Sequence, residues 1–127
     1  MHRLTVGLGE RSYDIAIGAG ALSEAGTHLA PFCPNGRAII VTDENVARHW
    51  LAPLAASLES AGITAEPIVL PPGEATKSWA ELERLVERLL DLDIAREESL
   101  IALGGGVIGD IAGFAAGIVK RGCGLVQ

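Results

Sequence analysis

The stretch that most constrains the fold runs from Ser99 to Gly117, where a short apolar segment is followed by three glycines and then by a second apolar segment. Leu100 to Leu103 has the continuous hydrophobicity of a strand buried on both faces of a parallel sheet. Gly104 to Gly106 permits a sharp backbone turn where larger side chains would clash. The stretch therefore predicts a strand, a glycine turn and a helix.

The same glycines match a phosphate-binding pattern. Gly104, Gly106 and Gly109 fit G-x-G-x-x-G, in which backbone N–H groups and the positive end of the next helix point at one spot. The alternative is a glycine-rich corner where a helix packs tightly on a sheet. Because a strand is predicted before the turn and a helix after it, we favour a cradle for nucleotide phosphates. The acidic residue expected about 20 positions later in that motif is absent, since the sequence stops at Gln127.

Length and composition limit the class of protein. A chain of 127 residues suits one domain, residues 1–127. Its formal net charge of −6 argues against a protein that binds nucleic acid or a membrane surface. No segment has the length of a membrane span and the start lacks the apolar run of a signal peptide, so we expect a cytoplasmic protein.

Cysteine and histidine residues suggest no metal centre. Cys33 and Cys123 belong to no C-x-x-C pair, and we expect them to be free thiols. The three histidines have no ligand spacing: His2, His28 and His49.

Hydrophobic periodicity predicts an α/β fold, a Rossmann-like parallel sheet with flanking helices and an N-terminal β-hairpin. The hairpin, residues 4–8 and 12–17, is expected at a sheet edge, and a short helix should follow over 21–29. Runs 37–42, 64–70 and 100–103 predict buried strands, and Val126–Gln127 predicts another. A helix should begin after Asp43, with Pro53 as a possible kink and Gly62 at its end. Ser78 should cap a helix that reaches about Leu92.

In such a sheet, ligands gather beyond the carboxyl ends of the strands, so loops 42–45, 73–77 and 104–110 should converge. Asp43 is either the cap of its helix or a ligand for ribose hydroxyls, and Asn45 has the same two interpretations. Glu74 and Lys77 offer an acceptor and a cation, but spacing alone favours a solvated surface pair. Asp110 either faces away from the phosphates, towards a sugar or nicotinamide, or merely caps its helix.

Four motifs carry a family resemblance: Thr42 to Val46, Pro72 to Lys77, Gly104 to Asp110 with Gly113-Phe114, and Lys120 to Gly122. Together they resemble the amino-terminal part of 3-dehydroquinate synthase. The resemblance implies a lyase of the shikimate pathway to aromatic amino acids. It converts 3-deoxy-D-arabino-heptulosonate 7-phosphate to 3-dehydroquinate and phosphate, using NAD and a divalent metal, zinc or cobalt. The family usually works as a homodimer.

The resemblance also implies roles for particular residues. Arg121 resembles the arginine that reaches the substrate across the dimer. The residues implied to contact NAD are Asp43, Asn45, Pro72, Gly73, Glu74, Lys77, Gly104, Gly105, Gly106, Val107, Ile108, Gly109 and Asp110.

This sequence also departs from the family pattern. The Pro-Thr-Thr segment, the substrate lysine and the Glu and two His that bind the metal are absent from it. We therefore expect a truncated enzyme that is inactive alone. Two alternatives stay open, a related sugar-phosphate cyclase or metal-dependent polyol dehydrogenase domain, and a nucleotide-binding module without chemistry.

Overall fold

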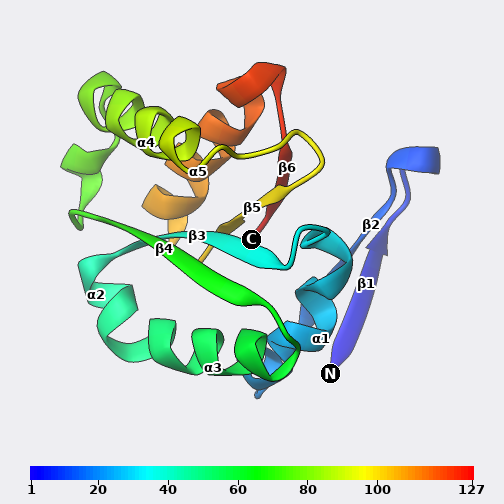
Figure 1. Ribbon diagram of the computed structural model, residues 1–127. Coiled ribbons are helices and arrows are strands. Elements are labelled where there is room, and N and C mark those ends of the chain that lie inside the picture. Colours follow the sequence, from blue (N-terminus) through cyan, green and yellow to red (C-terminus); the bar gives the residue numbers. More distant parts are fainter.

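The computed structural model describes residues 1–127 and contains two separate sheets (Figure 1). The main sheet has four parallel strands in the order β4-β3-β5-β6. These strands are β3 (Arg37–Asp43), β4 (Thr64–Leu70), β5 (Ser99–Ala102) and β6 (Gly124–Val126). The predicted α/β, Rossmann-like class is confirmed.

The strand order creates a switch point in the main sheet. From β3 the chain moves outward to β4, then crosses back to β5 on the other side of β3 and continues to β6. The connections that leave β3 and β5 therefore diverge to opposite sides. A crevice forms outside the carboxyl ends of such neighbouring strands, and it is the usual ligand site of doubly wound sheets.

Helices cover both faces of this sheet, as Figure 1 shows. One face carries α1 (Ala25–Leu29) and α3 (Ala52–Ser60), whose leucines pack on Ile40 and Ile101. The other face carries α4 (Trp79–Asp91) and α5 (Gly106–Ile118). The sheet is thus buried on both sides, which explains why its strands are continuous apolar runs.

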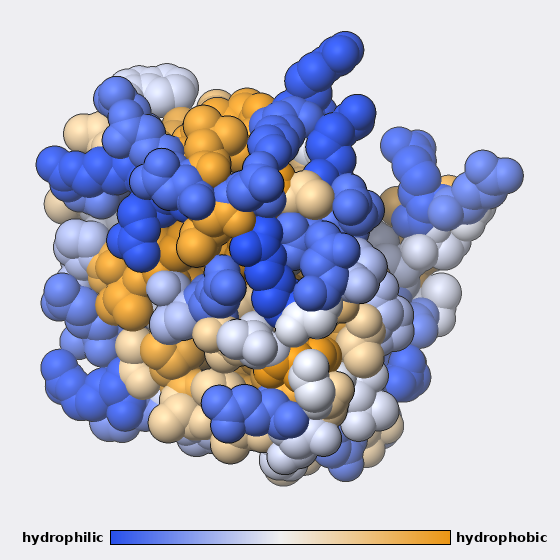
Figure 2. All heavy atoms as spheres, in the orientation of Figure 1, coloured by the Kyte–Doolittle hydropathy of each residue, from blue (hydrophilic) through white to orange (hydrophobic).

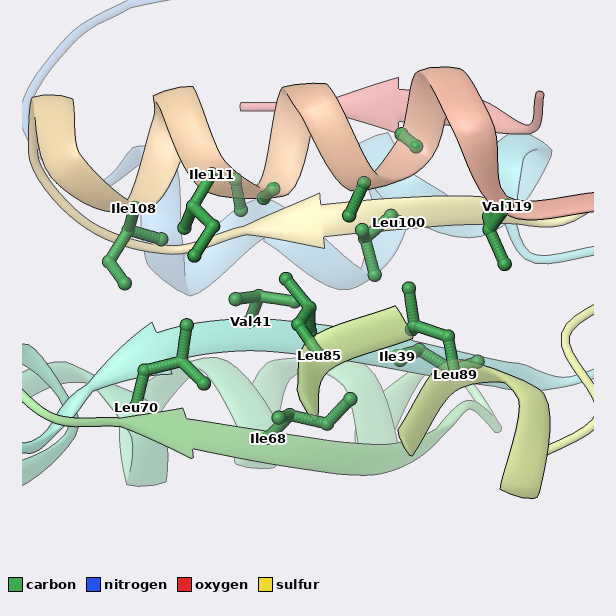
Figure 3. Close-up of a cluster of buried hydrophobic side chains, with 14 of the residues drawn as sticks. Ile39, Val41, Ile68, Leu70, Leu85, Leu89, Leu100, Ile108, Ile111 and Val119 are labelled. Atoms are coloured by element: carbon green, nitrogen blue, oxygen red, sulfur yellow. The ribbon is translucent and has the colours of Figure 1, made fainter. Parts of the chain in front are cut away.

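The larger core lies between the sheet and the pair α4 and α5. Figure 3 shows Leu85 of α4 beside Val41 and Leu89 of α4 beside Ile39, while Ile108 of α5 belongs to the same cluster. Leu85, Leu89, Val41 and Leu100 are fully buried. Ile108 belongs to this core as well, so the start of α5 is fixed directly onto the sheet.

The predicted N-terminal hairpin is confirmed as β1 (His2–Val6) and β2 (Tyr13–Ile17), but its expected position at a sheet edge is wrong, because it forms a separate sheet. Its two strands pair only with each other, because no strand of the main sheet lies alongside them. An Arg3–Asp14 ion pair of 3.5 Å lies on its polar face, while Leu4 and Ile15 are opposite each other on the apolar face. The hairpin projects from the body of the molecule (Figure 1).

Two predicted helices are less regular than their patterns suggest. The segment before Pro31 divides into a 3-10 turn (Ala21–Glu24) and α1, and Pro31 itself lies inside another 3-10 turn (Ala30–Phe32). After β3, a short α2 (Glu44–Val46) leads into a π-helical turn (Ala47–Leu51) and then into α3. The irregularity precedes Pro53, whose ring and missing N–H prevent regular α-helical bonding there.

Other boundaries agree closely with the sequence. Ser78 caps α4 by accepting a hydrogen bond from the Glu81 amide at 3.2 Å. Gly62 adopts a φ of +76° after α3, the left-handed conformation expected of a glycine that ends a helix. No helix is long and apolar enough to cross a membrane. On the face drawn in Figure 2, hydrophilic side chains project over much of the surface, with hydrophobic residues visible between them.

Candidate functional site

The candidate site lies at the switch point, where β3 and β5 end side by side. Val41 pairs with Ala102, and the Leu103 amide donates to the Val41 carbonyl at 2.9 Å. This register brings the turn after β5 next to Asp43 at the end of β3. The hollow here has a volume of about 390 Å³, and its lining is mostly glycine: Ala102, Gly104, Gly105, Gly106, Gly109, Asp110 and Gln127.

The glycines of the turn serve different purposes. None of Gly104, Gly105 and Gly106 has a positive φ, so the turn does not need the left-handed conformations that glycine permits. A Cβ at Gly104 would lie 2.9 Å from the Cβ of Ile108, so this glycine allows α5 to pack closely on the turn. A Cβ at Gly105 or Gly106 would meet nothing within 4 Å. The two interpretations of the motif, a tight corner and a cradle, therefore both apply, at different residues.

The open positions fit a pyrophosphate. Gly105 precedes α5 in an extended conformation, and no side chain caps the helix. The first amides of a helix have no intrahelical acceptor, and the helix dipole adds positive potential there. A diphosphate can approach these amides closely because Gly105 and Gly106 have no side chains in the way. The residues present thus fit the central group of a dinucleotide such as NAD.

An ion pair joins the second predicted loop to this helix. The Lys77 ammonium lies 2.7 Å from the Asp110 carboxylate and 3.6 Å from the Glu74 carboxylate. The hydrogen bond to Asp110, with the charge of Glu74 beside it, raises the pKa of Lys77. Lys77 therefore pairs with carboxylates of both loops, and the convergence of loops 73–77 and 104–110 is confirmed. Asp110 points to Lys77 rather than capping α5.

The structure assigns Asp43 to the capping role. Its Oδ1 accepts a hydrogen bond from the Val46 amide at 2.9 Å, which fixes the start of α2. The other carboxylate oxygen has no hydrogen-bond partner in the structure, so capping leaves one acceptor unused at the carboxyl end of β3. Asn45 lies exposed in the first turn of α2. Whether either residue also binds a ligand remains a prediction.

The sequence pattern did not reveal Thr76 or Gln127. Thr76 is 2% exposed, and its hydroxyl donates to the Pro71 carbonyl at 2.5 Å across the Pro72-Gly73 turn. Gly73 has a φ of +96°, a conformation that disfavours other residues. Gln127 lines the hollow and its Nε2 lies 3.5 Å from the Gly109 carbonyl. A threonine in a polar loop and a terminal glutamine carry no pattern that distinguishes them from surface residues.

Arg121 lies far from this hollow. It follows the carboxyl end of α5, a helix of 13 residues, which spans about 20 Å at the α-helical rise. Lys120 and Arg121 have φ values of +45° and +67°, uncommon for residues with side chains. The Lys120 ammonium lies 3.0 Å from the Asp93 carboxylate, which anchors this turn. Arg121 thus lies at the amino ends of the strands, and the glycine turn lies at their carboxyl ends.

No three His, Cys, Asp or Glu side chains gather as a metal site requires. The residues of this chain therefore do not fit the zinc or cobalt ion that the resemblance implies. Cys33 and Cys123 are free thiols, as expected. Burial raises the pKa of both, which disfavours the reactive thiolate.

Comparison with known proteins agrees with the motifs. The family model for the amino-terminal part of 3-dehydroquinate synthase matches residues 67–127. The 3-dehydroquinate synthase of Mesorhizobium japonicum is 54% identical over 122 residues, 96% of this chain and 32% of the relative. That of Ruegeria pomeroyi is 46% identical over 127 residues, the whole chain and 34% of the relative. Nearly the whole chain is therefore similar to 3-dehydroquinate synthases. It spans about one third of the length of these synthases.

Two solved structures of synthases share the fold of this chain. A 2-deoxy-scyllo-inosose synthase complexed with carbaglucose-6-phosphate, NAD⁺ and Co²⁺ has a TM-score of 0.82 at 24% identity, covering 98% of this chain and 34% of the other. The 2-epi-5-epi-valiolone synthase of Streptomyces hygroscopicus, with NAD⁺ and Zn²⁺ bound, has a TM-score of 0.77 at 27% identity, covering 93% of this chain and 32% of the other.

Proposed function

We propose that this chain is the NAD-binding part of a 3-dehydroquinate synthase, with the dinucleotide lying across the carboxyl ends of β3 and β5. The observation that carries the proposal is the open glycine turn, where Gly105 and Gly106 leave the first amides of α5 accessible. The pyrophosphate is held by these amides, with Val107, Ile108 and Gly109 forming the rest of the first turn. The Lys77 ammonium adds a cation next to Asp110, which lines the same hollow.

Polar groups around the turn orient the two ends of the dinucleotide. The unpaired oxygen of Asp43 accepts a hydrogen bond from a ribose hydroxyl, and the side-chain amide of Asn45 donates one to the ribose. Glu74 and Asp110 hold the Lys77 ammonium, while Pro72 and Gly73 shape the loop that carries it. Bound at these residues, NAD would supply reversible hydride transfer with a ring alcohol of the substrate.

The full reaction, conversion of 3-deoxy-D-arabino-heptulosonate 7-phosphate to 3-dehydroquinate and phosphate, is proposed for the whole enzyme in the shikimate pathway. We propose that residues outside this chain bind the divalent metal, zinc or cobalt, so the chain alone does not turn over substrate. We further propose a cytoplasmic homodimer. Arg121 lies at the other end of α5 from the glycine turn, and this position is compatible with a role at a partner's site.

Synthase activity is preferred over that of a related cyclase or polyol dehydrogenase because of sequence identity. The curated synthases are 46% and 54% identical to the chain, whereas the solved cyclases are 24% and 27% identical. A non-catalytic nucleotide-binding module would have the same glycine turn. An activity assay of the full-length protein distinguishes the two functions, because a synthase forms 3-dehydroquinate and a non-catalytic module forms no product.

Replacing Gly106 by leucine tests the cradle. The new leucine side chain would extend into open space, so we expect the fold to persist and NAD binding to weaken at least about tenfold, since the pyrophosphate can no longer approach. Amide shifts in a ¹⁵N NMR titration with NAD give both the dissociation constant and the residues affected.

Gly117→Leu is the matched control. Gly117 lies on the same helix, a Cβ there also meets nothing within 4 Å, and it is remote from the turn. Its NAD titration should match that of the unaltered chain. Unchanged NAD binding by Gly106→Leu would contradict the proposed site.

A further inference from the structure

The buried Thr76 hydroxyl is the strongest feature that the proposed function does not use. The residues on both sides of Thr76 in its loop are exposed, yet Thr76 itself is only 2% exposed. Its Oγ1 donates to the Pro71 carbonyl at 2.5 Å, while its amide donates to the Gly73 carbonyl at 3.1 Å. Side chain and backbone of one residue therefore close the Pro71 to Gly73 turn twice.

This closure determines where Lys77 emerges from the loop. The Lys77 amide donates to the Glu74 carbonyl at 3.0 Å, and the Ser78 amide donates to the Thr76 carbonyl at 2.9 Å. Ser78 in turn caps α4. Lys77 is thus held between a closed turn and a capped helix, and its ammonium meets Asp110 on the first turns of α5.

We propose that Thr76 is a positioning residue for the dinucleotide site, acting through Lys77. Its hydroxyl fixes the loop so that the Lys77 ammonium lies beside Asp110, which lines the same hollow as Gly105 and Gly106, and from there the ammonium raises the affinity for a diphosphate. The inference rests on the proposed NAD site. A flexible lysine side chain loses conformational entropy on binding an anion, and a fixed backbone with an Asp110 partner reduces that cost.

Three variants test the role of the hydroxyl in NAD titrations of the 127-residue chain followed by ¹⁵N NMR. Thr76→Val keeps the volume and removes the donor, and should weaken NAD binding about threefold to tenfold. Thr76→Ser keeps the donor and should stay within about twofold of the unaltered chain. Thr64→Val, an exposed threonine at the start of β4, is the control for the substitution itself and should change nothing.

A double-mutant cycle separates positioning from general support of the fold. Lys77→Met should weaken NAD binding, and Thr76→Val should then add no further loss in the Lys77→Met background. An equal loss in both backgrounds would overturn the proposal, because Thr76 would then act without Lys77. If Thr76→Val fails to fold, the pair Thr76→Ala and Thr76→Ser, which differ by the hydroxyl alone, replaces it.

The outcomes also distinguish the two proposals. Unchanged NAD affinity in Lys77→Met would contradict the role of Lys77 in the proposed site. Weakened affinity in Lys77→Met with full affinity in Thr76→Val would leave that site intact and overturn the role of Thr76.

Discussion

Single glycines in the turn after β5 meet different physical demands. Gly104 faces the Cβ of Ile108, a branched residue that is 1% exposed and fixed in the larger core. Gly106 faces open space one residue further into the helix than its N-cap. A protein needs the first glycine to fold and the second to admit a ligand, so substitutions at the two positions should separate stability from binding.

Gly104→Ala should destabilise the chain by about 1–3 kcal/mol, because the new Cβ forces Ile108 or the turn to move. Urea unfolding followed by circular dichroism measures the loss. Gly106→Ala is the control and should leave the free energy of unfolding unchanged or slightly raised, since alanine favours the helix. Equal stability of the two variants would show that Gly104 is not needed for packing.

At the scale of elements, the packing of α1 against α3 is set by backbone contact. A Cβ at Gly26 would lie 2.2 Å from the Ser57 carbonyl oxygen. The Gly26 amide donates to the Ser57 hydroxyl at 2.9 Å, and this hydroxyl donates to the Ser23 carbonyl at 2.9 Å. The short α1 is thus attached to the sheet layer through α3 by polar contacts as well as by its buried Leu29.

Gly26→Ala should cost about 3 kcal/mol or more, because it separates the two helices and leaves the Ser57 hydrogen bonds distorted. Thermal unfolding should show a lower midpoint. Thr27→Ala, at the exposed neighbouring position, is the control and should change the midpoint little. A midpoint for Gly26→Ala equal to that of the control would contradict close contact between α1 and α3.

On the scale of the whole molecule, the two ends of the parallel strands differ. At the amino ends of the strands, Arg37 binds the Glu98 carboxylate through two nitrogens at 2.8 Å and donates to the Leu92 and Asp93 carbonyls. Glu98 is 3% exposed. The open glycine turn lies at the carboxyl ends of the strands instead. The Arg37–Glu98 ion pair therefore lies at the end of the sheet opposite the candidate site.

The pH dependence of stability should reveal this ion pair. The hydrogen bond from Arg37 lowers the pKa of Glu98, so its contribution is present above the unfolded pKa of about 4.3 and is lost as pH falls through the folded value. Glu98→Gln should cost about 3 kcal/mol at pH 7, and its deficit should shrink below about pH 4. Urea unfolding between about pH 7 and pH 3 measures the difference. A deficit that stays constant with pH would contradict the ion pair.

The sequence alone determined the local elements of this protein. The apolar runs became β3, β4 and β5, Ser78 and Asp43 became helix caps, and Gly62 ended α3, because each depends on near neighbours and on burial of a continuous run. The resemblance carried by four motifs is confirmed by the similarity to 3-dehydroquinate synthases.

The tertiary structure decided what lies beside what. The adjacency of β3 and β5 and the Lys77–Asp110 pair bring together residues that are distant in sequence. Tertiary packing also decided that the hairpin lies apart from the main sheet. The roles of Gly104 and Thr76 depend on atoms brought close only by folding. Strand order is set by how whole faces pack, and such long-range packing leaves no local pattern to read.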